Sequence, residues 1–323
     1  MQPYSYFPQF EPKVKPEDVQ QLWLGNLKKY YVLNNSVYAK NKTDLVIKAS
    51  KVQDVTDLWN DGGITYTETT PIYQKGGALS QLVLGTKTDT NNVKVAGRTL
   101  LTNYDYDGTK TGANQVTNNL NLVKVNYTYT TDAKTKTDTT YARSLMALLG
   151  YNITNDENTN GLDLTNRVAT IRQMGSVYHS NPVLLTQEGK VVAKKNDAGQ
   201  VYIDSESRED YALFGTTQGL VSVVDAKTGV EKFSFVPKEM IEKQSETFKL
   251  NGGSLAGGKN ALYYGMDGEW TAQTVYVSKD DGTLTVKGTV RNVIGSATDK
   301  ENLKGKQWVY GGMRMGGRSY YAL

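Results

Sequence analysis

The sequence predicts an all-β protein, and three observations carry that prediction. Residues 211–237, YALFGTTQGLVSVVDAKTGVEKFSFVP, have the pattern of three strands joined by two tight turns. The chain has 31 glycines but only 7 prolines, a balance typical of many glycine turns between strands. Only two short segments, 142–149 and 238–244, have a pattern typical of helices.

The turns within residues 211–237 carry the residue types that such turns need. Two glycines bound the first turn, 215–219, and the second turn, 225–229, has the pattern Asp-x-x-Thr-Gly. Three consecutive antiparallel strands form a meander, which is the pattern of one blade of a β-propeller. We therefore expect a β-propeller as the architecture.

The rest of the chain is assigned in order around this meander. Residues 1–20 are polar with four prolines, which predicts an extended lead-in before a propeller domain over residues 21–323. Within that domain, residues 22–33 predict two short strands around Gly25 and Asn26, and residues from about 65 to 141 predict a polar, loop-rich insertion. The last expected strands are 270–277, 283–290, 307–310 and 319–323.

Composition excludes several classes of protein and site. The absence of cysteine excludes disulfides and thiolate metal sites. The formal net charge is only +4 and the basic residues are dispersed, so we expect no nucleic-acid partner. No apolar run reaches 18 residues, so no transmembrane segment is expected. The first residues lack a signal-peptide pattern, which leaves a cytosolic protein or a piece of a longer exported chain.

One loop has the spacing of a calcium site. Oxygen-bearing side chains stand at Asp156, Asn158 and Asn160, and Asp163 follows Gly161. A D-x-N-x-N-G run wraps oxygens around a hard cation, and Ca²⁺ takes about six to eight of them. An EF-hand would carry a bidentate Glu at its twelfth position, where Arg167 stands. The loop is therefore either a Ca²⁺ site or a solvated turn rich in Asp and Asn.

Two further features are expected to be structural. His179 is the only histidine, so it completes neither a histidine-rich metal site nor a recognisable catalytic triad. We expect it to bond the backbone and fix a blade. The glycines of residues 311–317 are followed by a strand and no Lys-Ser/Thr, which favours close strand packing over a phosphate site.

Four separated blocks carry a resemblance to a known family. They are WLGNLKKY at 23–30, MGSVYHSNPV at 174–183, the 211–237 meander, and GGMRMGGRSYYAL at 311–323. In order and type they resemble the C-terminal β-propeller domain of the PilC/PilY family, type IV pilus tip-associated adhesins and biogenesis factors. Ser176, Gln218 and Ser222 depart from the family pattern, where acidic residues or histidine are frequent.

The resemblance implies both architecture and function. It implies the first several blades of a propeller, since family members continue beyond the point that matches Leu323. It implies a non-enzymatic scaffold that assists pilus assembly, opposes retraction and attaches to host-cell or abiotic surfaces, with minor pilins at the pilus tip as partners. Such a protein is exported and lies at the pilus tip, the cell surface or the outer membrane.

Two alternatives remain open from the residues alone, a scaffold propeller of an outer-membrane assembly machine and a quinoprotein enzyme. The Asp-x-x-Thr-Gly turn followed by Phe233 is also typical of repeats in pyrroloquinoline-quinone dehydrogenases, which are propeller enzymes. Those enzymes often cover a quinone and calcium site with a vicinal disulfide, which a chain without cysteine cannot form. The quinoprotein fragment is therefore the second hypothesis, and the pilus-associated scaffold is the first.

Overall fold

The protein is built mainly from β-strands, as a computed structural model shows for residues 3–12, 22–60, 63–106, 116–127, 139–154, 156–158, 164–249 and 263–323. The strands of the first half are β1 (Tyr4–Phe10), β2 (Gly25–Leu33), β3 (Ser36–Tyr38), β4 (Ile47–Lys48), β5 (Lys51–Val52), β6 (Thr86–Thr88), β7 (Lys94–Ala96), β8 (Leu100–Tyr106) and β9 (Val116–Lys124). The later strands are β10 (Val183–Lys195), β11 (Val201–Gly215), β12 (Val221–Asp225), β13 (Glu231–Val236), β14 (Trp270–Val275), β15 (Val277–Ser278), β16 (Leu284–Thr285), β17 (Thr289–Asn292), β18 (Lys300–Leu303), β19 (Lys306–Gly312) and β20 (Tyr320–Ala322).

Helices are few and short. The α-helices are α1 (Gly77–Ser80), α2 (Thr139–Leu148) and α3 (Lys238–Lys243), and the 3₁₀ turns include η1 (Ile72–Gln74), η3 (Ser245–Phe248) and η5 (Arg314–Gly316). Both helices expected from the sequence are present, as α2 and α3.

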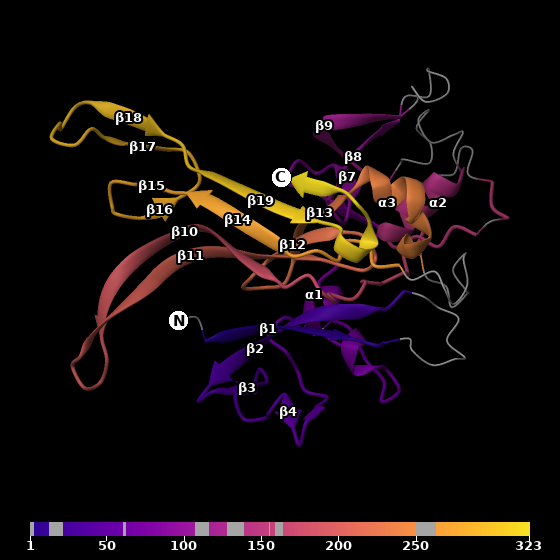
Figure 1. The fold of residues 1–323 in the computed structure, drawn as a ribbon, viewed down its shortest axis with the longest axis horizontal. Helices are drawn as coiled ribbons and strands as arrows, with labels where there is room; N and C mark the ends of the chain where they lie inside the picture. The colour runs from indigo at the N-terminus through magenta and orange to yellow at the C-terminus, as the bar shows by residue number, and fades with distance from the viewer. Residues whose placement is uncertain are drawn as a thin grey trace.

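The main sheet has eight strands in the order β15-β16-β10-β11-β12-β13-β8-β9. Three-stranded sheets flank it, one with the order β1-β2-β3 and one with the order β14-β19-β20 (Figure 1). The predicted all-β class is confirmed, and the arrangement is consistent with an incomplete β-propeller-like fold.

The predicted meander lies at the centre of the main sheet. Strand β11 pairs antiparallel with β12 from Tyr211↔Asp225 to Gly215↔Val221, and β12 pairs with β13 in turn. Gly219 closes the first turn with φ of 97°, and Gly229 closes the second with φ of 78°, conformations that favour glycine. The three strands and two turns predicted for residues 211–237 are therefore confirmed.

Residues 211–215 and most of β12 are apolar because both of their faces are buried, whereas β13 begins with the less buried Glu231 and Lys232. Leu213, Val221 and Phe235 belong to the larger core, which also includes residues of α2, α3 and β19. Ala212 and Phe214, which point to the opposite face of β11, belong to a second core with residues of β2 and α1. Burial on both sides explains the continuous apolar run YALF, since a half-exposed strand would alternate.

The N-terminal region forms a sheet against the second core. β1 pairs with β2 along its whole length, so residues 4–10 of the expected lead-in are a paired strand. Residues 25–33 form one strand, whereas the sequence predicted two short strands around a Gly25–Asn26 turn. Gly25 serves close packing instead, because a Cβ there would lie 2.8 Å from the Ser176 Cα atom.

The polar region from 65 to 141 contributes two strands to the main sheet. β8 pairs in parallel with β13 through Ser234↔Leu100 to Val236↔Thr102, and β9 pairs antiparallel with β8 at the sheet edge. The antiparallel hairpin of β6 and β7 lies earlier in the same region. This region therefore extends the scaffold as well as supplying loops.

The longest strand pair projects from the body of the molecule. β10 and β11 remain paired from Val183↔Leu213 to Lys195↔Val201, with register shifts around Glu188. In Figure 1 the pair curves away from the other elements as a two-stranded extension, ending in a turn. We call its outer part, residues 190–206, the arm.

Candidate functional site

Three of the four sequence blocks, the first, second and third, meet at one place, which we call the junction. The Trp23 carbonyl accepts hydrogen bonds from the Ser176 amide, at 2.9 Å, and from the Thr217 hydroxyl, at 2.9 Å. The Thr217 amide donates to the Ser176 carbonyl, and the Gly215 amide donates to the Ser180 hydroxyl. Blocks that are far apart in sequence are thus joined through their main chains.

Glycines allow this close approach of main chains. A Cβ on Gly175 would lie 2.2 Å from the Gln218 nitrogen, and one on Gly215 would lie 2.2 Å from the Met266 carbonyl oxygen. On Gly316 it would lie 1.8 Å from the Gly265 oxygen. Close strand packing, the role expected for the glycines of the last block, is what the structure shows.

The Asp-x-x-Thr-Gly turn docks on the N-terminal sheet. The Asp225 carboxylate accepts hydrogen bonds from the amides of the next turn residues, 227 and 228, at 2.8 and 2.9 Å. The Ala226 carbonyl accepts from Lys29 Nζ at 2.5 Å and from Trp59 Nε1 at 3.2 Å. Gly229 lies so near the Trp59 ring that a Cβ would be 2.6 Å from it. These internal contacts occupy the turn.

Buried polar residues of the first block anchor β2 to the segment that follows it. Asn26 donates to the carbonyls of Tyr73 and Gly76, both at 2.9 Å, and accepts from the Leu79 amide. Lys28 donates from Nζ to the Ile72 carbonyl at 2.8 Å, and burial lowers the pKa of its ammonium to about 8. The Asn-x-Lys pattern is therefore structural.

A surface cleft lies beside the junction, and we call it the tyrosine cleft. Its volume is about 520 Å³, within the range of small-molecule sites. It is lined by Tyr178, His179, Asn181, Gly268, Glu269, Gly312, Arg314 and Tyr320. The second and fourth sequence blocks supply most of these residues, so the cleft is our candidate functional site.

Asp267 contacts two of the side chains that line the cleft, those of His179 and Arg314. Its side chain is fully buried, and its carboxylate oxygens lie 2.8 and 2.9 Å from His179 Nδ1. Arg314 Nη1 lies 3.5 Å from the same carboxylate. Burial raises the pKa of Asp267, against the hydrogen bond with His179, which lowers it. His179 is thus held by a carboxylate, and sequence reasoning had expected only a backbone partner.

Aromatic packing fixes one wall of the cleft. The Tyr178 ring meets Trp23 edge to face at 4.9 Å between centroids, and meets Phe10 in the same way at 5.5 Å. Phe10 and Trp23 stack at 5.7 Å, and the His179 ring lies 3.9 Å from Tyr178. Residues of β1, the first block and the second block together hold the Tyr178 ring in place.

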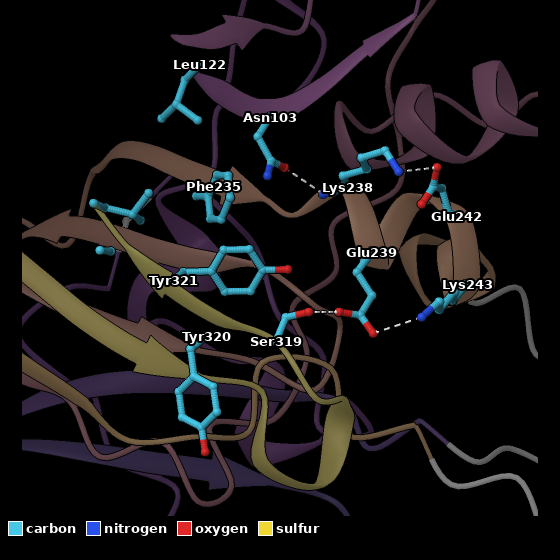
Figure 2. A pocket seen from close by; sticks show the side chains of 12 residues that line it. Asn103, Leu122, Phe235, Lys238, Glu239, Glu242, Lys243, Ser319, Tyr320 and Tyr321 are labelled. Atoms are coloured by element: carbon cyan, nitrogen blue, oxygen red, sulfur yellow. Dashed lines mark hydrogen bonds and ion pairs between the residues drawn. The ribbon is translucent and has the colours of Figure 1, made fainter. Parts of the chain in front are cut away.

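A second cleft, beside α3, has a different character (Figure 2). Its polar groups satisfy one another: Asn103 caps the Lys238 amide at 2.8 Å, Ser319 donates to Glu239, and Lys243 pairs with Glu239 at 3.2 Å. In Figure 2 the Tyr320 ring points away from α3, whereas Tyr321 points across the cleft. These contacts dock the last strand on α3, which is a structural role.

The predicted calcium loop is only partly described. Asp156 and Asn158 are exposed in a turn, and Asn160 and Asp163 lie outside the described residues. Arg167 pairs with the intervening Glu157 at 2.5 and 3.0 Å, and this hydrogen bonding lowers the pKa of Glu157 to about 2. Within the described parts of the chain, no three acidic or histidine side chains form a metal cluster. The calcium site remains a prediction.

Sequence reasoning found His179 but missed its partner and the cleft. Asp267 follows Met266 in a segment without strand alternation, so no pattern marked it. The glycine-rich fourth block also carries Arg314, and the carboxylate it meets is Asp267. Tyr320 and Tyr178 stood among 22 tyrosines, most of which could be strand residues.

Comparison with known proteins gives one partial similarity. The chain is 28% identical over 96 residues to the type IV pilus biogenesis factor PilY1 of Pseudomonas aeruginosa (strain UCBPP-PA14). The matched part is 28% of this chain and 8% of that protein. No family model matches the chain, and no solved structure matches it.

This similarity connects the chain to type IV pilus biogenesis over the matched part, at low identity. It agrees with the resemblance carried by the four blocks. In the described part of the chain, no helix has the length and apolar character needed to cross a membrane.

Proposed function

We propose that this chain is part of an exported, non-enzymatic factor that assists type IV pilus assembly and acts at the pilus tip as a surface adhesin. The observation that carries the proposal is the 96-residue similarity to a pilus biogenesis factor. The four blocks support it, because the first three meet at the junction and the fourth reaches it through Gly265, which lies against both Gly316 and Thr217.

The scaffold suits recognition better than catalysis. Its conspicuous polar groups are engaged in internal contacts, as Asp225, Asn26 and Lys28 show. The arm and the hairpin of β17 and β18 extend from the body in Figure 1, where they are accessible to a partner or a surface. A rigid sheet that presents projecting hairpins is the arrangement expected of a binding protein.

Gene deletion tests the proposal directly. Cells lacking the encoding gene are expected to show fewer surface pili and weaker attachment, and complementation with the full gene should restore both. Electron microscopy and quantification of sheared pilin measure the first property, and a surface-attachment assay measures the second. Normal piliation and normal attachment in the deletion strain would contradict the proposal.

The quinoprotein alternative predicts a different result. Purified protein mixed with pyrroloquinoline quinone, Ca²⁺ and an electron-accepting dye should reduce the dye in the presence of an alcohol. We expect no turnover, because the Ala226 carbonyl and Gly229 of the quinoprotein-like turn already contact Lys29 and Trp59. Alcohol-dependent dye reduction would favour the alternative.

We also propose Ca²⁺ binding by the loop of Asp156, Asn158, Asn160 and Asp163, on the spacing of its oxygens. Isothermal titration calorimetry with CaCl₂ should then give a saturable signal that Asp156→Asn with Asp163→Asn removes. Arg167 places a guanidinium beside the loop, which reduces its negative potential and favours weak binding. No heat of binding at millimolar calcium would reject this site.

A further inference from the structure

In the tyrosine cleft, side chains with binding capacity remain accessible. Tyr320 is 87% exposed, and the Arg314 side chain is 52% exposed. His179 uses Nδ1 for Asp267, which leaves Nε2 available to a ligand. In the α3 cleft, by contrast, the charged side chains are paired with one another.

The cleft is preorganised, so a ligand would order few side chains on binding. Tyr178 is held by Trp23 and Phe10, as described above. Asn181 donates from its amide to Glu269 at 2.8 Å, which fixes both planar groups. Because binding must compensate for the entropy of every side chain it immobilises, a fixed lining favours affinity in a shallow site.

Two glycines form part of the cleft lining. Gly268 and Gly312 approach so closely that a Cβ on Gly268 would lie 1.9 Å from the Gly312 carbonyl oxygen. Any larger residue at Gly268 would separate the segment before β14 from the end of β19. The Tyr320 ring packs on Gly312, since a Cβ there would lie 2.9 Å from two of its ring carbons, so glycine permits this position of the ring.

Arg314 supports a binding role through its backbone. Its φ is 48°, in the left-handed region that residues other than glycine seldom adopt. It stands in a glycine-rich segment, GGMRMGG, where glycine would meet the same backbone demand. Arginine in that position directs a guanidinium to the cleft.

The lining selects the chemical class of ligand. It contains no aliphatic side chain, which disfavours a lipid or an apolar peptide. The charges of Arg314 and Glu269 offset each other, which disfavours phosphate or sulfate groups. Two tyrosines and four planar hydrogen-bonding groups remain, from His179, Asn181, Glu269 and Arg314.

We propose that the tyrosine cleft binds a neutral saccharide. A sugar ring presents an apolar C–H face, which packs on an aromatic ring, and a rim of hydroxyls. Pairs of neighbouring hydroxyls match the two-pronged geometry of amide, carboxylate and guanidinium groups. Tyr320 supplies an exposed ring, Tyr178 a fixed one, and Arg314 with Asn181 and Glu269 the hydrogen bonds. As the recognition element of an adhesin, this site rests on the function proposed above.

A glycan array tests the proposal on the purified full chain. The array carries neutral hexose and N-acetylhexosamine glycans together with sialylated and sulfated ones, and the protein is clustered on streptavidin to detect weak binding. Binding to at least one neutral glycan is expected, and Tyr320→Ala should weaken it about tenfold. Arg314→Gly should weaken binding comparably, because it removes the guanidinium. The backbone of this variant should be unchanged, since glycine adopts the left-handed conformation without strain.

A matched tyrosine and a stability measurement serve as controls. Tyr202→Ala changes a tyrosine that is 45% exposed on the arm, so glycan binding should not change. Thermal unfolding should show that Tyr320→Ala remains folded, since its ring is solvent-exposed. Absence of binding to every neutral glycan, binding to charged glycans alone, or full binding by Tyr320→Ala would each overturn the proposal.

The outcome is separable from that of the gene deletion. A chain that supports piliation but binds no glycan ends this inference and leaves the proposed function standing. If the chain binds a neutral glycan but deletion of its gene leaves piliation and attachment normal, the saccharide site stands and the proposed pilus function is rejected.

Discussion

The body and the arm differ sharply, although one strand runs through both. In the body, residues 211–215 of β11 are all buried between two cores. In the arm, the same strand carries Val201 and Ile203 with 64% and 71% of their surface exposed. Register pairs them with Lys195 and Ala193 on one face of the arm. The arm thus shows a strand held by hydrogen-bonded pairing, whereas in the body the side chains of the same strand are also buried. We therefore expect substitutions in the body to lower stability more than substitutions in the arm.

The largest expected effect is in the body, at a buried ion pair. Arg98 Nη2 lies 2.6 Å from Glu231 Oε2, with both side chains about 5% exposed, and Arg98 also donates to the Leu148 carbonyl. Arg98→Met should lower the free energy of unfolding by about 3–5 kcal/mol, because it leaves a buried carboxylate unpaired. Urea unfolding followed by fluorescence measures the change.

The arm offers the matching control for that measurement. Lys194 and Asp204 form an ion pair at 2.7 Å, with side chains that are 41% and 39% exposed. Lys194→Met should leave the urea midpoint unchanged, because exposed pairs contribute little. Equal losses in the two variants would show that the arm is as tightly integrated as the body.

A glycine pair gives the next largest contrast. Gly268→Ala places a Cβ 1.9 Å from the Gly312 oxygen, so the main chains must separate. A loss of about 1–3 kcal/mol is expected, as for other overpacked sites. Gly189→Ala, at the base of the arm, meets its nearest atom at 3.4 Å, an ordinary contact, and should be tolerated. Thermal unfolding of both variants decides whether close packing is confined to the body.

Two aspartates extend the contrast to pH dependence. Burial raises the pKa of Asp267, whereas the hydrogen bond from Lys194 lowers the pKa of Asp204. Protonation of Asp267 therefore favours the folded state, and its contribution to stability falls as pH rises above 3.8. The contribution of Asp204 is present above 3.8 and is lost as pH falls. Carbon-13 NMR titration should resolve the two carboxyls on opposite sides of 3.8; coincident titrations would contradict this.

The smallest effect is expected at the exposed face of the arm. Ile203→Lys changes a side chain that is 71% exposed, so the free energy of unfolding should stay within about 0.5 kcal/mol. Differential scanning calorimetry measures it. A large loss would mean that the face is covered in solution, and size-exclusion chromatography would then show whether a second copy covers it.

The sequence predicted the elements whose signals are local. The 211–237 meander, α2 and α3 were found because turn glycines and apolar periodicity act over a few residues. The resemblance of four blocks predicted a common scaffold, and the junction joins three of them.

The remaining features depend on contacts between distant segments. Gly25 has the signature of a turn, yet it lies within a strand because Ser176 packs against it. Asp267 has no pattern of its own, and its significance arises only from His179, 88 residues earlier. The parallel pairing of β8 with β13 likewise joins a polar region to an apolar one. Local propensity carries no information about such partners.

The junction also sets the order in which the chain can fold. The Trp23 carbonyl accepts one of its hydrogen bonds from Thr217, 194 residues later. At a synthesis rate of about 5–20 residues per second, Thr217 is added about 10–40 s after Trp23, and this bond cannot form earlier. During that interval Leu22, which ends fully buried, lacks Tyr263, the distant residue that packs against it. The N-terminal segment around Leu22 is therefore one place in the nascent chain where exposed apolar surface favours premature association.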